Sequence, residues 1–312
     1  MWRCCPAHPG AARRHAPCEP QSPLVPWRCI MRSALILTGI LWFCSQTPAS
    51  AGLYSGPDDT THPIDPAIPS TSPLFVEWAD NILPLGSGTY FAPRGSTSIS
   101  LTGYNCLGDL SAEEIAEGDS PGYLTVTFPR GIRNGHGADF AVFENGFKYG
   151  TPNGLFMELA YVEVSTNGMD FARFPSISTN TGPVAGSSPF AGYDTTNVFN
   201  LAGKHAGGFG TPFDLENLLD DQLVLAGLVD INNIQFVKLV DIPGNGAFLD
   251  SLGNPILDNW MTSGSGGFDF RLPAGMGVGV INAVPEPGSL VLILSGAAAV
   301  ATLYRRRRKL AP

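Results

Sequence analysis

The sequence predicts an all-β fold: a single antiparallel β-sandwich, jelly-roll-like, with long loops and two short helices, followed by a C-terminal transmembrane helix. Three observations support this prediction. Short apolar segments recur between turns, and the 312 residues include 37 Gly and 27 Pro. Helical patterns are confined to two short stretches. The last residues combine an apolar run with a basic cluster, which is typical of a membrane anchor.

The N-terminal region has the features of an export signal. An apolar stretch over 34–43 follows a basic residue, and Ala49 and Ala51 supply the small side chains that signal peptidase needs. We therefore predict a secretory signal peptide over 31–51. Residues 1–30 are rich in Cys, Pro and Arg and would be unusual before such a signal. We interpret them as an extension from a mis-assigned start.

The body that remains, residues 52–285, is strongly acidic, with 25 Asp and Glu against 8 Lys and Arg. This charge disfavours nucleic-acid binding, because phosphate contacts need clustered Lys and Arg. It suits calcium, which prefers carboxylate and carbonyl oxygens, although solubility alone also explains it. Cys106 is its one cysteine, so an exported chain has no disulfide framework here. We interpret Cys106 as a buried or partly buried apolar residue.

The strands of the body are predicted by alternating or continuous apolar segments. Residues 52–73, rich in Pro, Ser, Thr and Asp, are predicted as a flexible leader, and residues 74–283 as the sandwich domain. Asn167-Gly168 is a strong hairpin signal, and Pro129 is expected to end a strand. The predicted strands cover 98–101, 124–128, 138–144, 158–165, 171–174, 233–241 and 276–281.

The helices and long loops complete the predicted domain. Ser111 and Glu114 have the spacing of a capping box, which predicts a short helix after Ser111. A second helix of two turns is predicted over 215–223. Residues 176–211 and 243–267 are rich in Gly, Ser, Thr, Asn or Pro, and we expect both to be long loops.

Oxygen-bearing side chains predict a calcium site. Asp139, Glu144 and Asn145 lie towards the ends of an apolar strand. A second group lies at the end of the predicted strand over 233–241 or after it. Its members are Asp241, Asp250, Asn254, Asp258 and Asp269. Calcium takes roughly six to eight such oxygens in a flexible shell. We expect a structural calcium that joins Glu144 to this loop, with solvated strand ends or Asx turns as the alternatives.

Other side chains are candidates for ligand binding. Lys204 and His205 lie in a Gly-rich stretch where the backbone can approach a ligand closely. A structural or solvated role for His205, or a zinc pair with His136, are the alternatives. Aromatic residues in or beside loops can stack on sugar rings or cap the core: Phe147, Tyr149, Phe156, Tyr193, Phe209 and Trp260. The predicted ligand site consists of Lys204, His205, Tyr193, Phe209 and Trp260.

Catalytic signatures are absent from the sequence. It contains no Gly-x-Ser-x-Gly, no His-Glu-x-x-His, no phosphate loop and no dinucleotide fingerprint. A glycosidase needs two opposed carboxylates, and acids are too frequent here to select a pair. We therefore nominate no catalytic residue and expect a protein that is not an enzyme.

The C-terminal segment, residues 284–312, has three parts in a fixed order. Pro285, Glu286 and Pro287 precede an apolar run over 289–304, which is shorter than the roughly 20 residues that span a bilayer. A basic cluster follows and would hold its end on the cytoplasmic side, namely Arg305, Arg306, Arg307, Arg308 and Lys309. These parts resemble the PEP-CTERM sorting signal of Gram-negative bacteria that make exopolysaccharide. The resemblance implies export, recognition by an exosortase-type membrane enzyme, and cleavage near the Pro-Glu-Pro tripeptide.

The body also resembles the core of a group of uncharacterised bacterial cell-surface proteins, many of which carry PEP-CTERM tails. The hairpin over 162–171 is similar to that of discoidin-type (galactose-binding-like) sandwiches, by fold analogy alone. This chain departs from the group near its end, where Arg271 stands in place of an acidic residue, so a ligand role at that position is in doubt. The matching stretches are 137–147, 158–165, 200–208, 211–215 and 250–256.

The sequence thus predicts an exported protein, anchored in the membrane by its C-terminus, with its body on the periplasmic or extracellular side. We expect a calcium-stabilised module that binds exopolysaccharide or another matrix component without catalysis. A structural coat protein is the alternative, and a carbohydrate-active hydrolase is a more distant one. The expected partners are an exosortase-type enzyme and a surface glycan, and no nucleic acid.

Overall fold

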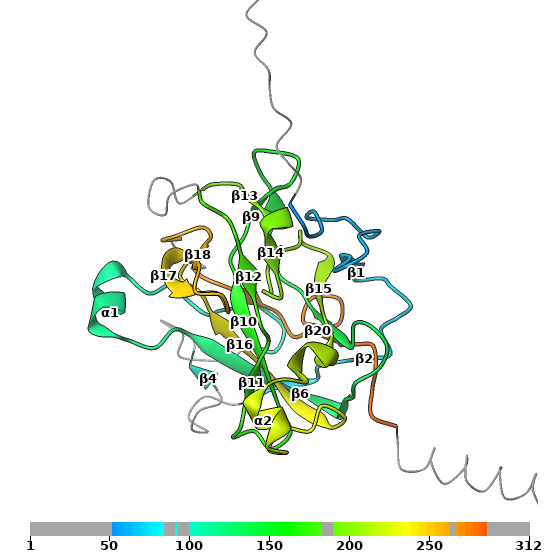
Figure 1. Cartoon of the computed structure of the whole chain (residues 1–312). Coiled ribbons are helices and arrows are strands. Elements are labelled where there is room, and N and C mark those ends of the chain that lie inside the picture. Colours follow the sequence, from blue (N-terminus) through cyan, green and yellow to red (C-terminus); the bar gives the residue numbers. More distant parts are fainter. Residues whose placement is uncertain (1–51, 84–90, 93–99, 183–189, 263–265, 286–312) are drawn as a thin grey trace, which may run out of the picture. The chain divides into compact units, whose positions relative to one another are not determined.

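The computed structural model describes residues 52–83, 91–92, 100–182, 190–262 and 266–285. Within these ranges the protein is all-β, with several antiparallel sheets and two short α-helices (Figure 1). The predicted fold class is therefore confirmed at this level. The predicted extension, signal peptide and membrane span lie outside the described residues. Within those residues, no helix is both long and apolar enough to cross a bilayer.

The larger sheet has six strands in the order β11-β10-β16-β6-β3, and β4 also pairs with β6. β16 lies between β10 and β6 and pairs with both in antiparallel register (Figure 1). The turn at Asn167-Gly168 joins β10 to β11, which confirms the predicted hairpin. The strands are β3 (Asn81–Ile82), β4 (Phe91–Ala92), β6 (Tyr123–Ile132), β10 (Ala160–Ser165), β11 (Ala172–Arg173) and β16 (Ile234–Asp241).

One strand end was predicted wrongly, because β6 continues through Pro129 to Ile132. The pairing between β6 and β16 shifts register between Ile234 and Phe236, opposite this proline. A proline has no N–H to donate, and a bulge is one of the few places where a strand tolerates it.

The second sheet has five strands in the order β1-β15-β7-β20-β2. Its central strands confirm the predicted apolar segments over 138–144 and 276–281. The strands are β1 (Ile68–Pro69), β2 (Glu77–Trp78), β7 (Phe140–Val142), β15 (Phe209–Phe213) and β20 (Val278–Val280).

The segment 52–73 is not a flexible leader, and this prediction was wrong. β1 is an edge strand of the five-stranded sheet, where it pairs with β15. The Tyr54 ring stacks on Phe199 with the ring centroids 4.9 Å apart. Ser55 and Asp65 are buried. Its polar composition suggested a solvated chain, but these polar groups are partners for buried groups of the body.

The remaining strands form small sheets, two of them within the predicted long loops. The loop over 176–211 contains β12, β13 and β14, and the loop over 243–267 contains the β17–β18 hairpin. The remaining strands are β5 (Asn105–Cys106), β8 (Phe147–Lys148), β9 (Gly154–Phe156), β12 (Ile177–Ser178), β13 (Tyr193–Asp194), β14 (Val198–Phe199), β17 (Asn245–Leu249), β18 (Pro255–Leu257) and β19 (Asp269–Phe270). The predicted strand over 98–101 is not found at residues 100–101, and residues 98–99 lie outside the described part.

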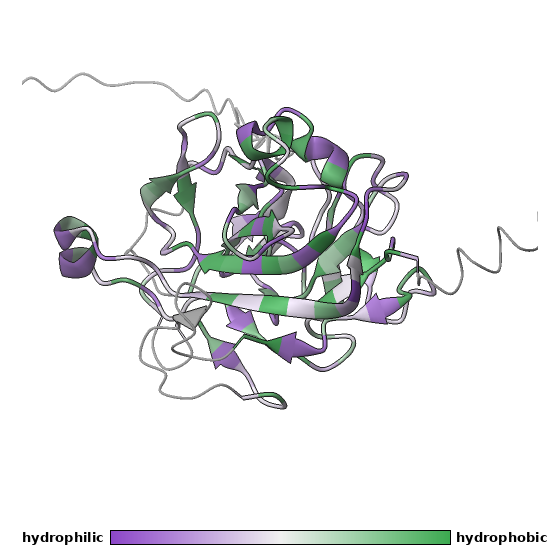
Figure 2. Ribbon diagram, turned by 90° about the horizontal axis from the view of Figure 1, so that it is seen from below, coloured by the Kyte–Doolittle hydropathy of each residue, from purple (hydrophilic) through white to green (hydrophobic). Residues whose placement is uncertain are grey.

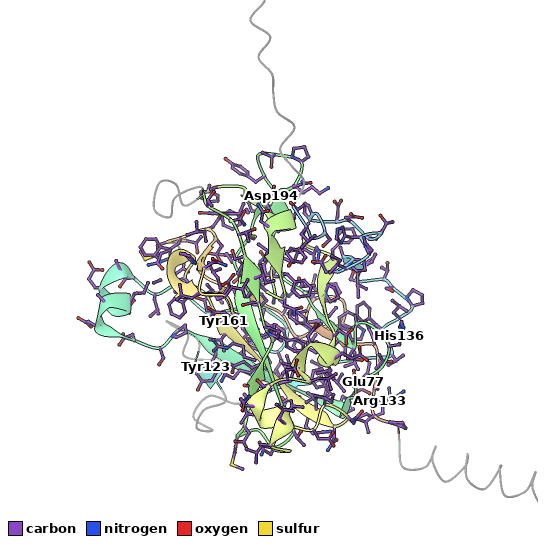
Figure 3. All side chains as sticks on the ribbon, in the orientation of Figure 1. Glu77, Tyr123, Arg133, His136, Tyr161 and Asp194 are labelled. Carbon is purple, nitrogen blue, oxygen red and sulfur yellow. The ribbon has the colours of Figure 1, made fainter. Side chains whose placement is uncertain are left out.

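The helices are short and capped by side chains. α1 (Ala112–Glu117) begins with the predicted capping box of Ser111 and Glu114. The predicted helix over 215–223 is instead two pieces, the 3-10 helix η2 (Leu215–Leu218) and α2 (Gln222–Leu225). Asp221 separates them, because its side chain accepts from the Leu223 N–H and starts α2. A further 3-10 helix, η1 (Thr195–Asn197), follows Asp194, which is labelled in Figure 3.

The core lies between the two large sheets, so the fold is sandwich-like. Apolar and polar residues alternate along the strands (Figure 2), and one apolar set from each sheet meets in a shared cluster. Phe140 of β7 stacks on Phe213 of β15 at 5.3 Å. The other face of the six-stranded sheet is covered as well: Tyr161 and Tyr123, labelled in Figure 3, lie in a second apolar cluster.

Candidate functional site

Six carboxylates from separate elements meet where several strands end, and we call them the acidic cluster. Asp241 ends β16, Asp258 follows β18, and Asp269 lies on β19. These strand ends bring together residues that are far apart in the sequence. The members are Asp109, Glu144, Glu158, Asp241, Asp258 and Asp269, and apart from Asp109 they are all buried.

One hydroxyl group lies between two members of the cluster. The Thr262 Oγ1 atom lies 2.9 Å from Asp109 Oδ2 and 2.7 Å from Glu158 Oε1. A hydroxyl has a single proton and can donate it to only one of these carboxylates. The other contact therefore requires a proton on that carboxylate or a cation beside it.

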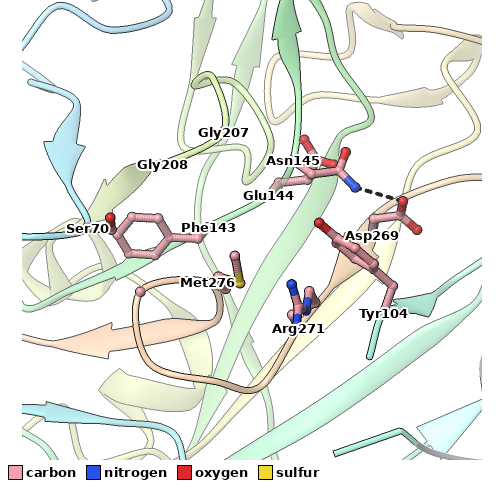
Figure 4. Close-up of a pocket in the computed structure, with 11 residues that line it drawn as sticks. Ser70, Tyr104, Phe143, Glu144, Asn145, Gly207, Gly208, Asp269, Arg271 and Met276 are labelled. Atoms are coloured by element: carbon pink, nitrogen blue, oxygen red, sulfur yellow. Dashed lines mark hydrogen bonds between the residues drawn. The ribbon is translucent and has the colours of Figure 1, made fainter. Parts of the chain in front are cut away.

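Glu144 lines a pocket of about 240 Å³ at the edge of the cluster (Figure 4). Its Oε2 atom accepts from the Gly146 N–H, but its buried Oε1 atom has no hydrogen-bond partner. Across the same pocket, the Asn145 side-chain amide donates to Asp269 Oδ2 at 2.9 Å. A buried carboxylate oxygen without a partner is costly, so Glu144 is the member of the cluster that most clearly calls for a ligand.

Two glycines allow the backbone to approach the other carboxylates. A Cβ atom at Gly244 would come within 1.5 Å of Asp258 Oδ1, and one at Gly267 within 2.5 Å of Asp241 Oδ1. Both glycines have a positive φ of 70°, which other residues rarely adopt. The backbone conformation at Gly244 and Gly267 therefore determines where the Asp258 and Asp241 side chains can lie.

Burial and mutual repulsion keep protons on the cluster. Burial raises the pKa of Glu144 to about 8, and burial together with the Glu144 charge raises the pKa of Glu158 to about 10. Burial also raises the pKa of Asp109 to about 6, and burial with the Asp109 charge raises the pKa of Asp258 well above its usual range. Among the described residues, no Lys or Arg forms an ion pair with any of these four carboxylates.

We expect the protein, in EDTA, to lose stability as the pH rises from about 5 to about 9. The pKa values of Glu144 and Glu158 are raised from 4.5 to about 8 and about 10. The folded state therefore holds protons that the unfolded chain releases above pH 4.5, and this stabilisation is lost as the pH rises through the folded-state values. Urea unfolding should show the free energy falling by several kcal/mol, because each proton held only in the folded state contributes about 1.4 kcal/mol per pH unit. A free energy that stays constant or rises would contradict these pKa values.

The structure brings together only part of the predicted calcium set. Asp139 lies at the opposite end of β7 from Glu144, where its oxygens accept from the Gly135 and Leu215 N–H groups. Asp250 and Asn254 bond to each other in a local turn, which was the alternative considered for them. No three His, Cys, Asp or Glu side chains in the described ranges already converge as a metal ion requires.

Lys204 and His205 are buried and hold the N-terminal segment, which corrects their assignment as ligand contacts. Lys204 is 0% exposed and forms an ion pair with Asp65, and its Nζ lies 3.2 Å from Ser55 Oγ. His205 Nε2 lies 2.8 Å from the same Ser55 Oγ, and Nδ1 lies 3.2 Å from Thr211 Oγ1. With both ring nitrogens engaged, His205 is not placed to form a zinc pair with His136.

The predicted aromatic contacts also have other neighbours in the structure. Tyr193 is buried in the second apolar cluster, which corrects its place in the ligand site. Trp260 Nε1 donates to Leu110 O at 2.9 Å, and Phe209 pairs with Pro69 of β1. Cys106 is partly buried, as predicted, and burial followed by the nearby Asp269 raises the pKa of its thiol to about 12.

Three exposed aromatic rings gather around the buried ring of Phe156, starting three residues after Glu144 in the chain, and we call Phe147, Tyr149, Phe156 and Phe190 the aromatic platform. Phe147 stacks on Phe156 with ring centroids 4.9 Å apart and meets Tyr149 edge-on at 6.4 Å. Phe190 lies 5.2 Å from Phe156. Phe156 is buried and contacts Phe147 and Phe190, and the exposed fractions are 47% for Phe147, 45% for Tyr149 and 58% for Phe190.

The folded body reaches the start of the C-terminal segment. Ala283 pairs with Ile132, and the Val284 N–H donates to Gly131 O. Residues 283–309 match the PEP-CTERM protein-sorting motif. The chain carries a PEP-CTERM sorting signal. This signal marks an exported, membrane-associated surface protein and an exosortase-type enzyme as its sorting partner.

The PEP-CTERM signal covers the end of the chain and leaves the chemistry of the body open. No curated protein and no solved structure shows significant similarity to the chain. Glu286, Pro287 and the basic cluster of the signal lie outside the described residues. The acidic cluster, the pocket and the aromatic platform are the features of the body from which a function can be proposed.

Proposed function

We propose that this protein is a cell-surface glycan-binding module, tethered by its C-terminal helix, which binds exopolysaccharide on the aromatic platform without catalysis. A bound calcium stabilises the loops beside the platform, and the sandwich has jelly-roll character. The observation that supports this proposal best is the group of three exposed aromatic rings around Phe156, on the segment of chain that follows Glu144 of the acidic cluster. Aromatic faces stack on the apolar C–H faces of sugar rings, and solvent-exposed rings leave such faces available.

The platform and the cluster share one segment of chain. Phe147 begins β8 only three residues after Glu144, and the Gly146 N–H between them donates to the Glu144 carboxylate. A Cβ atom at Gly146 would also come within 2.9 Å of Phe156 O. Whatever fixes the Glu144 side chain therefore helps to fix the Phe147 ring.

A hydrolase is the second candidate, and one observation favours it. Glu144 and Asp269 line the same pocket, and burial raises the pKa of Glu144 to about 8. Two facing carboxyl groups, one of them with a raised pKa, are the arrangement of a glycosidase. Release of reducing ends from the bound polysaccharide, lost in Glu144→Gln, would support this candidate over binding alone.

We expect Phe147→Ala and Tyr149→Ala to weaken polysaccharide binding. Each substitution removes one exposed stacking face and should cost about 1 kcal/mol, so that the double variant binds at least about tenfold more weakly. Affinity electrophoresis in gels that contain the polysaccharide would measure this. Met169→Ala and Leu252→Ala are matched controls, because these side chains are 76% and 71% exposed but are not part of the platform. Equal retardation of the double variant and the controls would exclude the platform as the binding site.

A further inference from the structure

We propose that a divalent cation of the calcium type binds inside the acidic cluster, between the side chains of Glu144, Glu158 and Asp269, beside the pocket that Glu144 and Asp269 line. This inference rests on the calcium in the proposed function and assigns it to particular residues. It differs from the site that the sequence predicts, because it adds Glu158 and keeps only Glu144 and Asp269 of the predicted ligands.

The first observation is the unpartnered oxygen of Glu144. This side chain is 6% exposed, its Oε1 atom has no hydrogen-bond partner, and it faces a pocket that Asn145 and Asp269 also line. An oxygen in such a position needs a proton, a water or a cation. The pocket gives access from solvent past Gly207 and Gly208, which are exposed.

The second observation is that two carboxylates share the hydroxyl group of Thr262. Its hydroxyl contacts Glu158 and Asp109 together and also accepts from the Gly267 N–H at 3.1 Å. One hydroxyl proton does not satisfy both acids, so a positive charge or an added proton is needed beside one of these two carboxylates. Glu158 is also electrostatically coupled to Glu144 and Asp269.

The arginine that lines this pocket has partners for part of its guanidinium, whereas its buried Nε atom has no hydrogen-bond partner among the described residues. The Arg271 guanidinium lies over the Tyr104 ring at 4.9 Å and donates to Thr102 O at 2.8 Å. A cation at the proposed site would be the counter-charge that the described ion pairs do not provide for Glu144 and Glu158.

The donor atoms indicate which cation fits. The side chains that face the site offer carboxylate, amide and hydroxyl oxygens, and the nearby Cys106 has a thiol that burial keeps protonated. Zinc prefers nitrogen and sulfur ligands, whereas calcium and magnesium prefer oxygen. The ligands come from separate loops and do not yet converge. Calcium tolerates such irregular shells, and magnesium demands a near-ideal octahedron.

Isothermal titration of the full chain, stripped with EDTA, with CaCl₂ and separately with MgCl₂ tests this site. We expect calcium to bind at least about tenfold more tightly than magnesium, and Glu144→Gln or Glu158→Gln to weaken calcium binding at least tenfold. Gln keeps the size of a protonated Glu, so both variants should fold, and unfolding in EDTA checks this. Asp220→Asn, which removes one exposed acid, is the matched control and should bind calcium as the unmodified protein does.

The results of this titration distinguish failure of the proposed cation site from failure of the proposed function. Calcium binding that survives both Gln variants but is lost in Asp250→Asn would overturn this site and leave the proposed calcium intact. No calcium binding at millimolar concentration would overturn both this site and the calcium, and the cluster would then hold protons alone. Polysaccharide binding by the aromatic platform is measured separately, so its failure does not affect this result.

Discussion

Replacing Asp65 with alanine is expected to destabilise the protein by about 3–5 kcal/mol, because it leaves a buried cation without its partner. Lys204 is 0% exposed, and its contacts are Asp65, the Ser55 hydroxyl and the Tyr54 ring at 5.6 Å. Burial already lowers the pKa of Lys204 to about 8, and Asp65 opposes this shift. Without Asp65, the ammonium group must lose its proton or be exposed to water. Equilibrium unfolding in urea at pH 7 measures the change.

A double variant separates the charge from the packing. Lys204→Met combined with Asp65→Leu removes both charges and keeps the volume similar, so it should be much less destabilised than Asp65→Ala alone. Asp58→Ala is a control on the same segment, because its ion pair with Lys148 is solvent-exposed and should contribute less than about 1 kcal/mol. A destabilisation of Asp65→Ala no larger than that of Asp58→Ala would show that segment 52–73 does not depend on this pair.

The second large effect is expected for Gly203→Ala, which should destabilise the protein by at least about 3 kcal/mol. Gly203 has a φ of +88°, and a Cβ atom there would come within 2.1 Å of Glu158 O. The backbone of Glu158 cannot move without displacing β10 and the acidic cluster. Gly203 thus lies between the Lys204 ion pair, which follows it in the chain, and the backbone of Glu158 in the candidate site.

Gly208 is a close match for this test, because its φ is also +88° but a Cβ atom there would meet nothing within 4 Å. Gly208→Ala should therefore show the cost of the backbone conformation alone, about 1–2 kcal/mol. Thermal and urea unfolding of the two variants gives the difference. Equal destabilisation would mean that the contact with Glu158 O does not restrict residue 203.

The strands could be predicted from sequence wherever a pattern within a few neighbouring residues determines the conformation. The Asn167-Gly168 turn and the alternation before it predict the β10–β11 hairpin, and the apolar run over 233–241 predicts β16. The capping box predicts the start of α1. Each of these signals lies within a few residues, and local chemistry decides the conformation.

The errors come from contacts between residues that are distant in the sequence. Segment 52–73 looks like a solvated leader, but Asp65 meets Lys204 across 139 residues. No local pattern indicates such a pair. The same applies to the short strands within 176–211 and 243–267, because β13 pairs with β9 and β12 with β14 in small sheets of mostly two-residue strands.

The candidate site was predicted only in part for the same reason. Glu144, Asn145 and Asp269 were proposed together from composition, and Asn145 does meet Asp269 across 124 residues. Glu158 and Asp109 were missed. An acid two residues before a wholly buried strand was a usable signal for Glu158, whereas Asp109 lies in a loop with no distinguishing pattern. Phe147, Tyr149 and Phe156 were recognised as loop aromatics, but Phe190 was not. Its packing on Phe156 depends on the folded chain.

Co-sedimentation of the full chain with exopolysaccharide from the organism that produces the protein tests the central claim most directly. The polysaccharide is pelleted with the protein in CaCl₂ and, in parallel, in EDTA. A glycan-binding module should pellet with the polysaccharide in calcium, less in EDTA, and less again in the Phe147→Ala/Tyr149→Ala double variant. Absence of the unmodified protein from the pellet in both conditions would contradict glycan binding and favour a structural coat protein.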